Sequence, residues 1–344
     1  MIIPQEKKDN FSAENRSCGK VDFRDPQMCY VHLTDNCFMR CKMCKFWQTP
    51  QRVSKVPLDD WERFFSSFKE YIHEPIDISI GGGEPLTHEN LFPLIKIIRG
   101  LGFRLVLNSN GYLIDTEIAL KIKDAKVNSI MLSLDSLKSG THDYLRGKTG
   151  ALSSVFEAIE CLDYVAPEVD ISISATIMES NLEDILSLAR WAQEHSSIKF
   201  INFQAVTQPF NENHNDQWYL KKTARSIWPQ NIEQVYSVLD KLIELKMKKF
   251  HKICNPVSQL ALYKKYFKDP QGFVERKGPC NAVDFGIFIF PAGDIALCPY
   301  KLPIGNVRQD FRELYLSTSA QERRREIASC KDVCHFLLNC NYEE

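Results

Sequence analysis

The chain has 344 residues, with 43 Lys and Arg against 44 Asp and Glu, so its formal net charge is −1. This balance argues against the broad basic surface of a nucleic-acid-binding protein, and no run of about 18 apolar residues could span a bilayer. The N-terminus is charged and lacks the apolar segment of a signal peptide, so we expect a cytoplasmic protein. Twelve cysteines in such a chain favour metal binding over disulfides.

Apolar segments of strand and helix character alternate along the chain. Short apolar runs predict six strands, near residues 30–34, 76–80, 104–108, 129–133, 171–177 and 200–204. Helical patterns follow these strands, at residues 57–71, 91–99, 116–125, 153–165, 181–194 and 231–247. This alternation predicts parallel pairing in an α/β fold, and six strands suit a partial (β/α)6 TIM-like barrel better than a closed eight-stranded one.

The first predicted strand ends in a loop with three cysteines, Cys37, Cys41 and Cys44. Thiolates are the usual ligands of iron–sulfur clusters, and three of them leave one iron of a [4Fe–4S] cluster for a ligand that is not protein. A zinc site and free thiols are the alternatives. Zinc sites usually contain two Cys-x2-Cys pairs, which a single three-cysteine loop does not provide.

A glycine-rich turn, residues 81–85 (Gly-Gly-Gly-Glu-Pro), follows the second predicted strand. Glycines let the backbone approach a ligand closely, and free peptide groups together with the Glu84 carboxylate can hold an ammonium group. Such a turn is by itself common in loops. Its place matters, because α/β folds bind ligands at the edge where parallel strands end.

The spacing Cys-x3-Cys-x2-Cys, followed by Gly-Gly-Glu-Pro, resembles the signature of the radical S-adenosylmethionine (SAM) enzymes. In that family the open iron is chelated by the amino and carboxylate groups of SAM. The resemblance covers most of the first 205 residues. It implies that SAM is bound by residues of four motifs: Met43; Gly82, Gly83, Glu84 and Pro85; Asn108, Ser109 and Asn110; Ser133, Asp135 and Arg146.

Two of these motifs carry particular expectations. The position of Met43 is often aromatic in the family, and a thioether against adenine would give a softer contact. Ser133 and Arg146 are chemically suited to the SAM carboxylate, as a hydroxyl donor and a fork-shaped cation. Their alternatives are a helix cap for Ser133 and a surface ion pair for Arg146.

The C-terminal part predicts a hairpin at residues 285–298 and a helix near 311–328. It resembles the cysteine-rich SPASM and Twitch domains. A full SPASM domain has seven cysteines for two clusters. The smaller number here implies one auxiliary [4Fe–4S] cluster, held by four of five residues, namely Cys280, Cys298 and two of Cys330, Cys334 and Cys340. Zinc is the main competitor, because four thiolates suit either metal.

We therefore divide the chain into an N-terminal extension (1–26), a radical SAM partial barrel (27–250), and a linker with the SPASM/Twitch-like domain (251–344). We expect the last of these to fold back over the mouth of the barrel. The loop at 205–230 is rich in Asn, His and aromatic residues, and is either a substrate-facing lid or a packing loop.

The resemblance implies reductive cleavage of SAM to a 5′-deoxyadenosyl radical and hydrogen-atom abstraction from a substrate carbon. An oxidised or cross-linked product, in natural-product or peptide modification, would follow. The electron would come from a reductase or a flavodoxin- or ferredoxin-type donor. The substrate is a small molecule or a peptide, so a sugar or aminocyclitol dehydrogenase or epimerase is an alternative. A non-catalytic iron–sulfur scaffold or electron-transfer protein is an alternative of another class, and the charge balance argues against an RNA-modifying enzyme.

Overall fold

The computed structural model describes residues 26–48, 52–73, 76–209, 215, 217–248, 250–271, 280, 286–330 and 338–339. Its strands and helices, in chain order, are β1 (Met28–Thr34), α1 (Leu58–Tyr71), β2 (Asp77–Gly82), α2 (Leu91–Gly100), β3 (Arg104–Ser109), α3 (Thr116–Asp124), β4 (Ser129–Ser133), α4 (Ser139–Arg146), α5 (Ala151–Val165), β5 (Asp170–Ile177), α6 (Ile185–Glu194), β6 (Ile198–Ala205), α7 (Ile232–Met247), α8 (Val257–Lys268), β7 (Gly286–Ile289), β8 (Asp294–Ala296), β9 (Gly305–Asn306), α9 (Phe311–Leu316) and α10 (Thr318–Ala328). None of the helices within these ranges combines the length and apolar character needed to cross a membrane.

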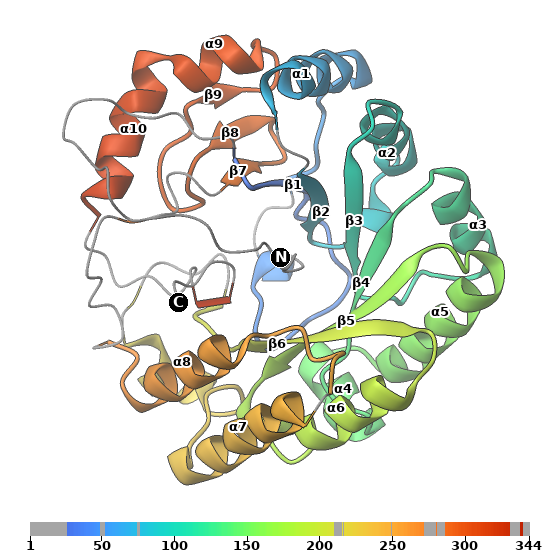
Figure 1. Cartoon of the computed structure of the whole chain (residues 1–344), viewed down its shortest axis with the longest axis vertical. Helices are drawn as coiled ribbons and strands as arrows, with labels where there is room; N and C mark the ends of the chain where they lie inside the picture. Colours follow the sequence, from blue (N-terminus) through green and yellow to red (C-terminus); the bar gives the residue numbers. More distant parts are fainter. Residues whose placement is uncertain are drawn as a thin grey trace.

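One sheet organises the fold, in the order β6-β5-β4-β3-β2-β1-β7-β8-β9. Strands β1 to β6 are neighbours in sequence order and all pair in parallel, which confirms the predicted α/β fold. The sheet curves into an arc with α1, α2, α3 and α5 on its outer side (Figure 1). Successive side chains alternate between the two faces of the sheet. Val31 therefore belongs to the main core, whereas Tyr30 and His32 lie on the other face, near Phe290.

We expected the C-terminal domain to fold back over the mouth of the barrel, but its hairpin extends the sheet instead. Strands β7 and β8 pair antiparallel, as predicted, yet β7 also pairs in parallel with β1, Met28 opposite Gly286. Because Phe288 lies opposite Ala296, the chain leaves β8 beside the start of β7. Cys298 therefore lies near the amino-terminal end of β1, whereas the three-cysteine loop follows the carboxyl-terminal end.

Strand β6 is one edge of the sheet, and its outer side is closed by segments from far along the chain. The Ile201 N–H donates to the Lys252 carbonyl (2.7 Å), and the Asn255 amide pairs with the backbone of Phe203 (2.7 and 2.8 Å). The Asn339 amide pairs in the same way with Ala205 (2.9 and 2.8 Å). The C-terminal segment is thus anchored to the barrel edge opposite the hairpin, where it satisfies backbone groups that would otherwise be unpaired.

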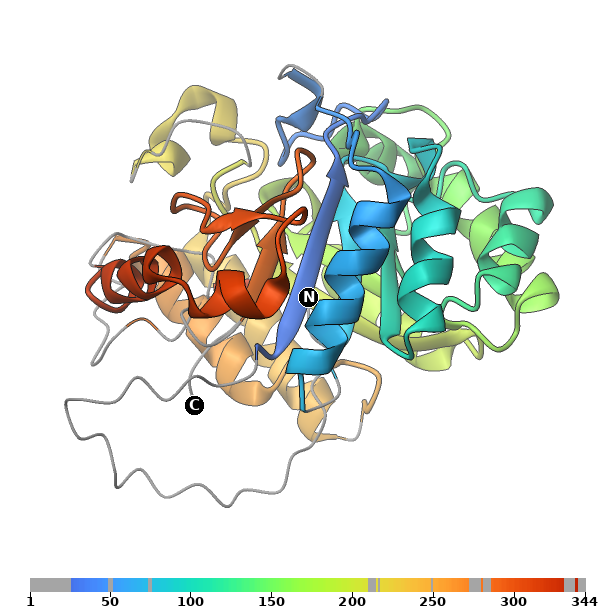
Figure 2. The same ribbon diagram turned by 90° about the horizontal axis from the view of Figure 1, so that it is seen from above.

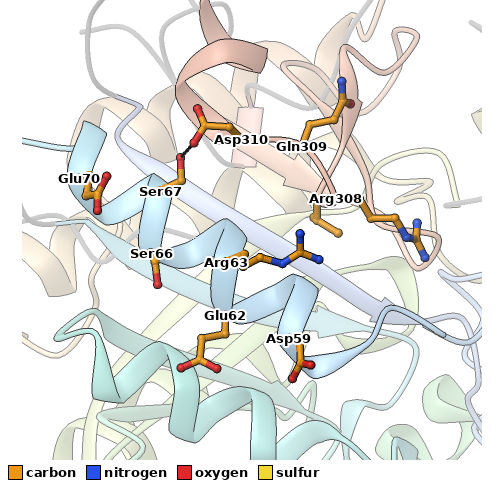
Figure 3. A pocket seen from close by; sticks show the side chains of 10 residues that line it. Asp59, Glu62, Arg63, Ser66, Ser67, Glu70, Arg308, Gln309 and Asp310 are labelled. Atoms are coloured by element: carbon orange, nitrogen blue, oxygen red, sulfur yellow. Dashed lines mark hydrogen bonds between the residues drawn. The ribbon is translucent and has the colours of Figure 1, made fainter.

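The predicted helix near 311–328 is two helices, α9 and α10, because the chain is extended at Ser317, which caps α10. Helix α9 packs on α1 through Phe311, whose ring centroid lies 4.6 Å from that of Phe68. Ser67 of α1 donates to the Asp310 carboxylate (2.5 Å) and accepts the Phe311 N–H (3.0 Å). An open cleft of about 670 Å³ lies along this junction (Figure 3). Its charged side chains come from α1 and from residues 308–310, which precede α9.

Two helices, α4 and α8, were missed by the periodicity analysis. Helix α4 has only eight residues, two of them buried, and the apolar residues of α8 are interrupted by Lys264 and Lys265. The described part of the 205–230 loop behaves as a packing loop. Its Trp218 and Trp228 are buried, and Trp228 contacts Tyr266 and Phe267 of α8 at centroid distances of 5.4 and 5.3 Å.

We expect Phe311→Ala to lower the free energy of unfolding by about 3–5 kcal/mol, because it removes a fully buried ring from the α1–α9 contact. Urea unfolding followed by circular dichroism measures the change. Leu302→Ala is the control, since that side chain is 69% exposed and should change stability by less than about 0.5 kcal/mol. Equal stability of the two variants would contradict the assigned packing.

Candidate functional site

The three-cysteine loop is held by the end of α4. The Arg40 N–H donates to the Arg146 carbonyl (3.1 Å), and the Lys42 N–H donates to the Leu145 carbonyl (2.8 Å). Gly147 caps α4 with φ +61°, and a Cβ there would lie 2.3 Å from the Arg40 carbonyl oxygen. Only glycine permits both this backbone conformation and this close approach. Gly147 therefore has a backbone role in supporting the loop.

A buried group at the end of β1 fixes the start of the same loop. His32 Nε2 lies 2.8 Å from Asp35 Oδ1, and Arg52 Nε lies 2.6 Å from Asp35 Oδ2. The Asp35 N–H also donates to the Arg52 carbonyl (2.7 Å), so the segment before the three cysteines is joined to the segment after them. These contacts lower the pKa of Asp35 against the opposing effect of burial. Sequence analysis missed this group, although polar residues at a strand's carboxyl end were the available signal.

The three thiols lie close together on this loop. Burial raises the pKa of Cys37 to about 12 and that of Cys44 to about 11, and it also raises the pKa of Cys41. Neighbouring thiolates add to the rise for Cys37 and Cys44. Three thiolates are stable here only with a compensating positive charge, which bound iron supplies.

The donor set of the loop is three thiolates on one short segment. Within the part of the chain that the structure describes, no three His, Cys, Asp or Glu side chains form a group that could hold a metal ion. Thiolates are the usual ligands of iron–sulfur clusters, and each thiolate of a cubane binds a different iron. The loop Cys37–Cys44 is therefore suited to hold a [4Fe–4S] cluster.

Glu84 joins two of the predicted motifs. Its carboxylate accepts the Ser109 hydroxyl (2.9 Å), the Asn110 N–H (2.8 Å) and the Leu86 N–H (3.2 Å). Burial raises the pKa of Glu84 to about 7, although these hydrogen bonds favour its charged form. Glu84 also contributes to the raised pKa of Cys37, so the carboxylate lies close to the cysteine loop.

Gly82 and Gly83 bring the end of β2 against the end of β1. Gly82 has φ +119°, and a Cβ there would lie 2.3 Å from His32 Cδ2. The Gly83 N–H donates to the Thr34 carbonyl at 2.6 Å. The glycine-rich turn therefore lies directly against the segment that leads into the cysteine loop, as the order of the parallel strands predicts.

Arg146 and Asp135 form a buried ion pair, with Arg146 Nε 2.8 Å from Asp135 Oδ2. The surface ion pair considered for Arg146 is therefore wrong, since its side chain is only 12% exposed. Arg146 also hydrogen-bonds Cys41, and its charge opposes the rise in the pKa of that thiol. Asp135 in turn accepts the Thr176 N–H (2.9 Å), and its own N–H donates to His142 (3.2 Å). Burial lowers the pKa of His142 to about 3, so this imidazole is neutral.

The remaining predicted residues lie near the same edge of the sheet. Met43 is half-buried against the core, and Pro85 is buried at the start of a 3₁₀ turn, Pro85–Thr87. Asn108 donates to the Ser79 hydroxyl (2.8 Å) and the Ile80 carbonyl (3.0 Å), which ties it to β2. Ser133 ends β4 opposite Ser174. Contact of these residues with SAM stays a prediction.

The second cysteine group is described in part. Cys280 and Cys298 are buried, and Cys330 follows α10 with intermediate exposure. Cys334 and Cys340 lie outside the described residues, as does nearly all of the predicted extension at 1–26. The thiol side chains suit an iron–sulfur cluster in their chemistry. Which of the five would bind it stays open.

The chain is similar in sequence to known proteins. Residues 31–192 match the family model of the Radical SAM superfamily. The chain is 24% identical over 329 residues to an AdoMet-dependent heme synthase of Methanosarcina barkeri, covering 93% of this chain and 89% of that protein. It is 30% identical over 177 residues to a GTP 3′,8-cyclase of Aliarcobacter butzleri, covering 50% of this chain and 54% of that protein.

Solved structures show the same fold. SuiB of Streptococcus suis bound to S-adenosylmethionine matches with a TM-score of 0.66 at 17% identity, over 88% of this chain and 68% of that one. The anSMEcpe structure with bound AdoMet matches with a TM-score of 0.65 at 17% identity, over 92% and 88% of the two chains. These solved structures show the fold, and the match of residues 31–192 to the family model identifies that part of the chain as a radical SAM domain.

Proposed function

We propose that this enzyme binds a [4Fe–4S] cluster through Cys37, Cys41 and Cys44, cleaves SAM reductively, and abstracts a hydrogen atom from a substrate carbon. The observation that carries the proposal is the hydrogen bond from the Glu84 N–H to the carbonyl of Asn36 (2.8 Å), the residue before Cys37, which supports a candidate ammonium site next to the cysteine loop. When bound, the cluster supplies the electron that splits SAM into methionine and a 5′-deoxyadenosyl radical. A non-catalytic scaffold would not need this carboxylate.

The side chains around the loop have distinct proposed roles. Glu84 would receive the SAM ammonium, since a carboxylate with three donors still has lone pairs to offer. Gly82 and Gly83 would allow SAM to approach the backbone closely. Arg146 would hold the loop and balance the charge of Cys41, with Asp135 orienting it. These roles need the burial that the site provides, since water would weaken each contact.

We further propose one auxiliary [4Fe–4S] cluster, bound by Cys280, Cys298 and two of Cys330, Cys334 and Cys340. The burial of Cys280 and Cys298 fits this proposal, because a cluster bound there would be shielded from solvent.

The substrate we favour is a peptide, modified to an oxidised or cross-linked product. Structures of the same fold have peptides bound, the precursor peptide SuiA in SuiB and a Cp18Cys peptide in anSMEcpe. A heme precursor is the second candidate, favoured by the near full-length similarity to an AdoMet-dependent heme synthase. In either case we propose a flavodoxin- or ferredoxin-type protein as the electron donor.

The first test is iron content and SAM cleavage. Anaerobically reconstituted protein should contain about eight irons and release 5′-deoxyadenosine when reduced with dithionite in the presence of SAM. The triple variant Cys37→Ala, Cys41→Ala, Cys44→Ala should retain about four irons and release none. Cys298→Ala should also retain about four, yet still cleave SAM. Four irons in the unmodified protein would rule out the auxiliary cluster.

The second test concerns Glu84. Glu84→Gln keeps the shape of the side chain but removes the charge that would pair with an ammonium group, so SAM should bind about ten- to a hundredfold more weakly. Equilibrium dialysis with labelled SAM measures this, and the cluster's visible absorption should not change. Glu89→Gln is the control, since that carboxylate is exposed. Unchanged SAM affinity in Glu84→Gln would remove Glu84 from the proposed site.

The third test separates the two substrate classes. A true substrate should increase the release of 5′-deoxyadenosine and lose hydrogen to it, so deuterium placed at the reacting carbon should appear in 5′-deoxyadenosine. Mass spectrometry after incubation with iron porphyrin precursors of heme, and in parallel with candidate precursor peptides, decides between them. Deuterium transfer from the porphyrin alone would replace the peptide proposal with the second candidate.

A further inference from the structure

The cysteine loop is surrounded on its outer side by cations that lie over aromatic rings. Lys42 Nζ lies 4.8 Å from the ring centroid of Tyr144. Lys148 Nζ lies 4.9 Å from that of Tyr112 and 5.7 Å from that of Phe38. Arg40 and Lys45 lie 6.0 and 5.9 Å from the centroid of Trp47. We call these four cations, Arg40, Lys42, Lys45 and Lys148, the basic collar.

The collar is a single surface although its residues come from two parts of the chain. Backbone hydrogen bonds join the cysteine loop to the end of α4, from Arg40 to Arg146 and from Lys42 to Leu145. The Phe38 and Tyr112 rings lie 5.4 Å apart, and Lys148 lies over both. The cations are therefore held around the loop by contacts with rings.

The charge of this surface differs from that of the whole chain. The stretches 36–48, 108–114 and 139–150 contain only one acidic residue, Asp143, whose carboxylate accepts the N–H groups of Gly150 and Leu152. Arg40, Lys42 and Lys148 form no ion pair with any residue that the structure describes. Asp35 and Glu84, the nearest carboxylates of the site, are buried beneath the loop. A local excess of positive charge thus faces solvent in a chain of net charge −1.

The collar surrounds the point at which an electron would enter. Cys37, Cys41 and Cys44 are of intermediate exposure, so the loop that would hold the cluster reaches the protein surface. Electron-transfer partners make small, weakly buried interfaces, and complementary charge governs how fast and in which orientation they meet. An acidic partner that docks here would bring its redox centre next to the loop.

We propose that the basic collar is the docking surface for a small acidic electron-transfer protein of the flavodoxin or ferredoxin type. This inference rests on the proposed function, because the collar needs a cluster in the loop to serve. In the complex the reduced donor would give up one electron, and a cluster held by Cys37, Cys41 and Cys44 would accept it. The contacts with aromatic rings restrict the motion of the cations, which reduces the entropy lost on docking.

The experiment compares a protein donor with a chemical one. The reconstituted enzyme is supplied with SAM and reduced either by dithionite or by limiting amounts of an acidic flavodoxin with its NADPH-dependent reductase. The double variant Lys42→Glu, Lys148→Glu should lose about tenfold or more of its flavodoxin-driven 5′-deoxyadenosine release at low salt. Its dithionite-driven rate should stay within about twofold of the unmodified enzyme.

Binding gives a readout independent of turnover. The dissociation constant for oxidised flavodoxin, measured by calorimetry, should rise about tenfold or more in the same variant. Raising the ionic strength should weaken binding to the unmodified enzyme and have much less effect on the variant. Lys42→Arg, Lys148→Arg keeps both charges and should behave as the unmodified enzyme.

Lys96→Glu on α2 is the matched control, an exposed charge reversal outside the collar that should change neither rate nor binding. The proposal is overturned if Lys42→Glu, Lys148→Glu keeps flavodoxin binding and flavodoxin-driven cleavage, or if Lys96→Glu loses them equally. Equal loss of the dithionite-driven rate would also overturn it, because the lysines would then support the loop itself. Binding of single-stranded RNA in place of flavodoxin would make the collar a nucleic-acid surface. Failure of the unmodified enzyme to cleave SAM with dithionite would instead refute the proposed function, and the docking proposal would fall with it.

Discussion

The buried pair between Arg146 and Asp135 is the contact on which the site depends. It links α4 to β4, and through Asp135 to Thr176 of β5, while Arg146 reaches Cys41. A charge taken out of water this completely must be paired, and removing one partner of such a pair costs about 3–5 kcal/mol. The position of Arg146 therefore follows from the ends of two strands. The same contact fixes the cysteine loop, because the backbone of this loop is hydrogen-bonded to the residues just before Gly147.

Much of the barrel could be predicted from sequence because its signals are local. Each of the six parallel strands is a short apolar run, and Gly82 or Glu84 stands where such a run ends. The pairing of β7 with β1 could not be predicted, because Gly286 and Met28 are far apart in sequence and parallel register carries no turn signal. The placement of Cys298 depends on that pairing. It followed only from the structure.

The same limit applied to the side chains of the site. The sequence indicated that Glu84, Ser109 and Asn110 belong to one ligand-binding edge, since three motifs followed three neighbouring strands. It did not indicate that they bond directly to each other. His32 and Arg52 were missed for another reason. Both contact Asp35, but His32 lies in β1 and Arg52 lies after the cysteine loop. A pattern search within one element does not detect a contact between two separate segments.

The arrangement along β1 separates two ends of the molecule. The cysteine loop follows Thr34, while the chain leaves β8 at Ala296, level with Tyr30, in the direction of the amino-terminal end of β1. The basic collar surrounds only the first of these ends. A donor attracted by positive charge is thereby directed to the cysteine loop and away from the second cysteine group. If an electron leaves a substrate radical through that second group, it does so at the opposite end of the barrel. If both cysteine groups hold the proposed clusters, such a separation would let one chain accept and release electrons at two separate sites.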